Sequence, residues 1–117
     1  MAAPNLLSLT TVTASTAVQN VTTSATAIVT NSSGSNKVYK LTALYVSNND
    51  ASTGYKLTAD LYRSATAYPF AVSVTIPTNS TLDVISKPIY LLEGDAIRLT
   101  ADTNSKLVAV CSWEEIS

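Results

Sequence analysis

The segment that decides the fold is Tyr55-Lys56-Leu57-Thr58-Ala59-Asp60-Leu61-Tyr62-Arg63. Over its first seven positions every second residue is apolar or aromatic, and each intervening residue is polar. Because successive side chains of a strand point to opposite faces of a sheet, this period of two predicts a half-buried β-strand. The buried face is predicted to hold Tyr55, Leu57, Ala59 and Leu61.

Similar patterns recur further along the chain. Alternation over residues 70–76 predicts that Phe70, Val72, Val74 and Ile76 point inward. Alternation over residues 97–101 predicts the same for Ile97, Leu99 and Ala101. Residues 38–46 and 107–111 are instead apolar on both faces, which is typical of strands that lie centrally in a sheet or against a neighbouring subunit.

The composition supports the same fold class. The chain has 17 Thr, 11 Val and 6 Ile but only 3 Glu, 1 Gln and 5 Lys, and β-branched side chains pack better on a pleated sheet than on a helix. Turn segments rich in Asn, Asp, Ser and Gly divide the chain at short intervals. We therefore predict an all-β chain, a single-domain antiparallel β-sandwich or jelly roll spanning residues 14–117.

The first thirty residues contain no charged side chain and run through Leu6-Leu7-Ser8-Leu9 into a Thr-, Ser- and Ala-rich stretch. The three leucines need burial, so we predict that residues 1–13 form an extended arm that pairs with another chain. The alternative is an ordinary first strand of the same sandwich. Because the start has no basic region, the sequence does not indicate a signal peptide.

Several classes of function are disfavoured by what the chain lacks. It has no His and one cysteine, Cys111, which excludes Ser-His-Asp and Cys-His catalysis, an internal disulfide and the usual zinc knuckles. Its net charge of −1 lacks the basic excess of nucleic-acid-binding proteins. No run of 18 apolar residues indicates a membrane-spanning helix. We expect a protein that is not an enzyme and needs no cofactor or metal.

The sequence offers two kinds of candidate site, each with an ordinary structural alternative. Glu93 with Asp95, or Asp50 with Asn48 and Asn49, offer oxygen ligands that calcium accepts, although such short segments are more often turns. The six tyrosines could bind sugars, but tyrosines at strand positions more often form core or subunit contacts. The residues predicted to contact another subunit or a capsid are Leu6, Leu7, Leu9, Tyr39 and Tyr45.

Three parts of the chain resemble small β-sandwich virion proteins of tailed bacteriophages. One is the Leu91-Leu92-Glu93-Gly94-Asp95-Ala96-Ile97-Arg98-Leu99 hairpin, followed by the acidic end Trp113-Glu114-Glu115-Ile116. The others are the opening Pro4-Asn5-Leu6-Leu7-Ser8-Leu9 and the strand Lys37–Asn48, which leads into an Asn-rich turn. Gly-Asp hairpins also occur in other jelly rolls, including tumour-necrosis-factor-like trimers.

The resemblance implies a structural part of a virion made in the host bacterial cytoplasm, with no catalytic residues. A capsid decoration (cement) protein is the first expectation, with itself, as a homotrimer, and the major capsid protein as partners. The alternatives are a neck or tail accessory and a carbohydrate- or receptor-binding module. A low charged fraction of 13%, about half the usual share, suits a protein buried between subunits.

Overall fold

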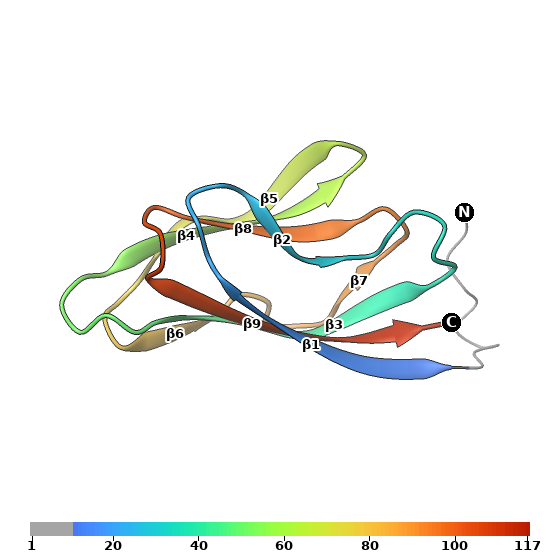
Figure 1. Cartoon of the computed structure of the whole chain (residues 1–117), viewed down its shortest axis with the longest axis horizontal. Helices are drawn as coiled ribbons and strands as arrows, with labels where there is room; N and C mark the ends of the chain where they lie inside the picture. The colour runs from blue at the N-terminus through green and yellow to red at the C-terminus, as the bar shows by residue number, and fades with distance from the viewer. Residues whose placement is uncertain (1–10) are drawn as a thin grey trace.

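Antiparallel strands form two facing sheets in the computed structural model, which describes residues 11–117 (Figure 1). The predicted all-β sandwich is confirmed, and this part of the chain contains no helix. The strands are β1 (Val12–Asn20), β2 (Thr26–Thr30), β3 (Val38–Asn48), β4 (Tyr55–Arg63), β5 (Thr66–Ile76), β6 (Ser80–Asp83), β7 (Ile89–Leu91), β8 (Ala96–Ala101) and β9 (Leu107–Ile116).

The chain crosses repeatedly between the two sheets. The first sheet, called sheet A, has the order β1-β9-β3-β6, with β7 also pairing with β3; the second, sheet B, has the order β2-β8-β4-β5. Each sheet therefore combines strands from the beginning and the end of the sequence. This is the strand order of a jelly roll, in which two Greek keys close around one core.

The core lies between the sheets and follows the predicted alternation in β4 and β8. Leu57 and Ala59 of β4 are fully buried, while Tyr55 and Leu61 pack against the edge of the core. The predicted face of β8 is also buried. The remaining fully buried large side chains come from both sheets and from the loops; they include Val21, Leu41, Leu44, Val46, Ile76, Leu91 and Leu107.

In β5 the prediction is wrong for two of its four inward residues. Phe70 is 39% exposed and Val72 is 65% exposed, whereas Ile76 is buried. Two irregularities in the pairing with β4 account for this, because the partner of Leu57 is Val74 but the partner of Ala59 is Ala71. An extra residue at a bulge reverses which side chains face the core, so Ala71 packs against the core in place of its neighbours.

The strands that are apolar on both faces occupy the middle of sheet A. β3 and β9 pair with each other along their whole length, and each has a further strand on its other side. The central position of β3 and β9 therefore explains in part why both of their faces are apolar. Their outward side chains are not all covered, since Tyr45 and Val110 are exposed.

The sandwich begins earlier than the predicted boundary at residue 14. Thr11 exchanges two backbone hydrogen bonds with Ser117, at 3.0 and 2.9 Å, and β1 continues the pairing from Val12. Val12 and Thr13 of the predicted arm therefore belong to β1, and Thr11 is bonded to the end of β9. Leu6, Leu7 and Leu9 lie outside the described residues, so the arm itself stays a prediction.

Two buried asparagines, Asn31 and Asn48, form hydrogen bonds that hold the loops at the two ends of β3. The Asn48 amide donates to the carbonyls of Thr53 and Ile76, at 2.9 and 3.0 Å, and its oxygen accepts from the backbone N–H of Asp50. At the opposite end of β3, the Asn31 amide donates to the carbonyls of Lys37 and Leu91. Each side chain thus supplies a donor to one loop carbonyl and to the carbonyl of the last residue of a strand, Leu91 in β7 or Ile76 in β5.

We expect Asn48→Leu to destabilise the protein by about 2–4 kcal/mol, because an apolar side chain of similar size leaves three backbone groups without partners. Chemical denaturation followed by tryptophan fluorescence measures the change. Asn49→Leu is the matched control, since Asn49 is the exposed neighbour. An unfolding free energy within 0.5 kcal/mol of wild type for Asn48→Leu would contradict the role given to this amide.

Candidate interaction surface

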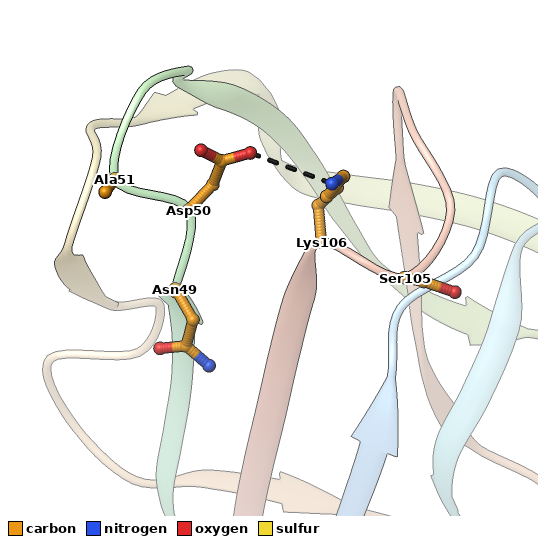
Figure 2. Close-up of a pocket in the computed structure, with 5 residues that line it drawn as sticks. All are labelled: Asn49, Asp50, Ala51, Ser105 and Lys106. Carbon is orange, nitrogen blue, oxygen red and sulfur yellow. Dashed lines mark ion pairs between the residues drawn. The ribbon is translucent and has the colours of Figure 1, made fainter.

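A polar hollow of about 380 Å³ lies between the β3–β4 loop and the turn before β9. Asn49, Asp50, Ala51, Ser105 and Lys106 line it (Figure 2). An ion pair spans it, with Lys106 Nζ 3.7 Å from Asp50 Oδ2.

The carboxylate of Asp50 is occupied by donors from its own chain. It accepts hydrogen bonds from the backbone N–H and the hydroxyl of Ser52, both at 2.8 Å, and from the hydroxyl of Tyr55 at 2.9 Å. These bonds, with a smaller contribution from Lys106, lower its pKa to about 2. Both oxygens of this carboxylate therefore accept hydrogen bonds from the same chain, and the loop is a tightly bonded turn.

The second acidic turn is likewise structural. Asp95 is buried and receives hydrogen bonds from the Arg63 guanidinium, at 2.8 Å for Nε, and from the backbone N–H of Leu92. Burial alone would raise its pKa, but these donors outweigh it and the pKa is lowered. Glu93 accepts no hydrogen bond in the described part of the chain. No group of three potential metal ligands occurs among residues 11–117.

The thiol of Cys111 is unreactive. Its side chain is fully buried in β9, and burial raises the pKa of its thiol to about 12. The reactive thiolate is therefore essentially absent at neutral pH. Residues 11–117 also hold no helix able to cross a membrane.

On sheet B a charge pair covers the middle of the outward face, while exposed apolar and aromatic side chains (Tyr68, Phe70 and Val72) lie on the edge strand β5. Arg98 donates to both oxygens of Asp60, at 3.0 and 3.2 Å, and its guanidinium lies 4.0 Å from the centre of the Tyr62 ring. Because the carboxylate is buried while the guanidinium remains partly exposed, the pair covers this face with a satisfied charged group.

The outward face of sheet A is different. Three neighbouring strands place one apolar or aromatic side chain each in a single row: Val18 pairs with Val110, which pairs with Tyr45. They are 70%, 37% and 46% exposed. We call Val18, Val110 and Tyr45 the apolar row. Adjacent exposed apolar side chains on a sheet mark an interaction surface more strongly than scattered ones.

The predicted contact residues do not come together at this surface. Tyr45 is part of the apolar row. Tyr39, on the same strand, packs against the core and stacks on Trp113, with ring centres 6.1 Å apart. Leu6, Leu7 and Leu9 lie outside the described residues.

Sequence reasoning missed Val18 and Val110. Val18 lies in a Thr-, Ser- and Ala-rich stretch and Val110 in a strand that is apolar on both faces. Only the pairing of β9 with β1 and with β3 places the two side chains in a row with Tyr45. For Val18 the sequence did contain one signal. Residues 1–30 have no charged side chain, whereas segments that face solvent usually carry several.

No protein-family model matches the chain, and no curated protein matches it in sequence. A solved structure from work on Bacillus endospore appendages, described as forming a novel family of disulfide-linked pili, is similar to it. The match covers 98% of this chain and 95% of that chain, with a TM-score of 0.57 and 11% sequence identity. At this identity the likeness concerns the fold.

The lowered pKa of Asp50 predicts a specific acid sensitivity. A carboxyl whose folded-state pKa lies below its unfolded value of 3.8 contributes stability above that value and loses it as pH falls through its folded pKa. We expect the melting temperature to fall between pH 4 and pH 2, and to fall less in Asp50→Asn. Thermal unfolding at closely spaced pH values tests this, with exposed Asp83→Asn as the control. Equal slopes in wild type and Asp50→Asn would contradict it.

Proposed function

We propose that this chain is a non-enzymatic structural subunit that associates with copies of itself, and that its role is to decorate and stabilise the head of a tailed phage. The observation that carries the self-association is the apolar row on sheet A. The row is exposed by three adjacent strands, whereas the exposed large apolar side chains of sheet B belong to one edge strand, β5, and its middle strands carry the Arg98–Asp60 pair. The phage role rests on the resemblance of the hairpin, the Asn-rich turn and the acidic end.

The similar structure supports the general part of this proposal. It belongs to pili, which are assemblies of many copies, and its fold matches along nearly the whole chain. The disulfide linkage of those pili is not available here, because the single cysteine is buried in β9. Assembly of this chain would therefore depend on non-covalent contacts.

A sugar-binding role has less support, because three of the six tyrosines are engaged within the chain. Tyr39 stacks on Trp113, Tyr55 donates to Asp50, and Tyr62 lies beneath Arg98. The exposed tyrosines are Tyr45, Tyr68 and Tyr90. Tyr68 belongs to sheet B and the other two to sheet A, so they do not form one aromatic platform.

Light scattering of the purified full-length protein over a dilution series tests self-association. We expect a mass that is a multiple of the 12.3 kDa chain, with three copies being the number that the sequence resemblance predicts. Val110→Glu should lower this mass while the subunit stays folded, because it places a charge in the centre of the apolar row. Ala67→Glu, an exposed position on sheet B, is the matched control. A monomer at every concentration would contradict the proposal.

The phage role has its own test. Particles assembled without the protein should lose their contents at lower temperature than complete particles, because a decoration protein ties neighbouring capsid subunits together. Particles that lack the protein and resist heat equally well would remove the decoration role while leaving self-association intact.

A further inference from the structure

The sheet edges of this sandwich differ sharply in how they are protected against pairing. β2, β6 and β7 are short, with five, four and three residues. β5 is long, but it contains Pro69 and the irregular pairing described above. Proline, bulges and short length are the ordinary means by which proteins prevent strands from joining edge to edge.

β1 has none of these protections. It is a nine-residue edge strand of sheet A (Figure 1) without proline or charge, and its pairing with β9 shows no register shift. A long, regular, uncharged edge strand is a ready template for another strand. The outer edge of β1 is therefore suited to pair with a further strand.

The pairing pattern identifies the backbone groups that face outward. Thr11 and Ser117 exchange both of their hydrogen bonds, so alternate residues of β1 from Thr13 onward also bond to β9. The intervening residues direct their N–H and C=O groups away from β9, and no other strand of residues 11–117 pairs with that side. These residues are Val12, Ala14, Thr16, Val18 and Asn20.

We propose that β1 binds a second copy of this chain by pairing antiparallel with the partner's β1, so that sheet A continues from one copy into the other. The inference deepens the proposed function, since it rests on self-association and names the contact. A second copy fits because the strand has no charge to repel itself, and because the two edges offer the same donors and acceptors at matching spacing.

The side chains select one register. When Ser15 faces Ser15 of the second copy, Val18 lies opposite the partner's Val12. Within one chain Val12 already lies in a row with Ile116 and Val38. The apolar row of one copy then meets the partner's exposed Val12, which lies beside the partner's buried Ile116 and Val38.

The neighbouring register breaks this continuity. With Thr16 at the centre, Val18 would face Ala14 and Val12 would face Asn20 of the second copy, which places a polar amide at the end of the row. The Ser15-centred contact also uses the same surface on both copies, so it closes on two chains. A trimer would require a contact between unlike surfaces.

Ala14→Pro in the full-length chain tests the contact. The N–H of Ala14 points away from β9, so proline removes an outward donor while leaving the bonds of β1 to β9 intact. We expect the mass measured by light scattering to fall by half with little change in melting temperature. Should this variant fail to fold, Ala14→Lys serves the same purpose, because the side chain is exposed and charge blocks edge pairing.

Ser15→Cys tests the register. Ser15 residues facing each other would form a close, non-hydrogen-bonded pair, whose separation permits a disulfide. Mild oxidation should give a reducible covalent dimer, whereas Thr23→Cys, in the loop after β1, should not. Background from the buried Cys111 is small, because burial raises the pKa of its thiol.

The outcomes separate this contact from self-association in general. A wild-type oligomer whose mass is unchanged by Ala14→Pro and Ala14→Lys, and that gives no Ser15→Cys dimer, overturns the β1 contact and leaves the proposed function standing. A wild-type monomer at all concentrations overturns both. A trimer that persists in the Ala14 variants likewise excludes two-fold pairing through β1.

Discussion

The pairing of β3 with β9 is the constraint on which the rest of the structure depends. These two strands run antiparallel over their whole length, from Val38 opposite Ile116 to Asn48 opposite Leu107. They supply core side chains such as Leu44 and Cys111 on one face, and they receive β1, β6 and β7 along their outer edges. Since they are widely separated in sequence, this ladder closes the chain on itself and fixes both ends of sheet A.

Side-chain hydrogen bonds then define the ends and the second sheet. Asn31 and Asn48 donate to the loop carbonyls of Lys37 and Thr53 at opposite ends of β3. In sheet B, Arg98 joins β8 to Asp60 of β4. Buried polar groups of this kind are costly unless every partner is present, so they favour one arrangement of the loops over alternatives that an apolar core alone would tolerate.

Local sequence patterns predicted the parts of this fold that regular strands determine. The faces of β4 and β8 follow their alternation, and the central position of β3 and β9 follows from their apolar composition. β5 does not follow its pattern, because bulges depend on how it meets β4 and the alternation of its own residues contains no sign of them. Phe70 and Val72 were therefore assigned to the wrong face.

The interaction surface was harder to predict for a related reason. Val18, Val110 and Tyr45 come from three strands, and their shared row exists only once β1, β9 and β3 are in register. The sequence of a single strand cannot distinguish an outward valine that a neighbour will cover from one that stays exposed. Tyr39 and Tyr45 illustrate this, since one stacks inside the sandwich and the other lies on its surface.

The distribution of charge connects these observations to assembly. A solvated edge strand normally carries a lysine, a proline or a bulge at little cost, so their joint absence from β1 is not required by the sandwich itself. The same molecule uses proline and bulges on β5, where exposed Tyr68, Phe70 and Val72 would otherwise invite pairing. One long edge is thus protected while the other is left regular, uncharged and adjacent to the apolar row. That asymmetry is costly for an isolated soluble monomer, because it favours aggregation, and it is useful to a subunit whose exposed edge is covered in its assembled state.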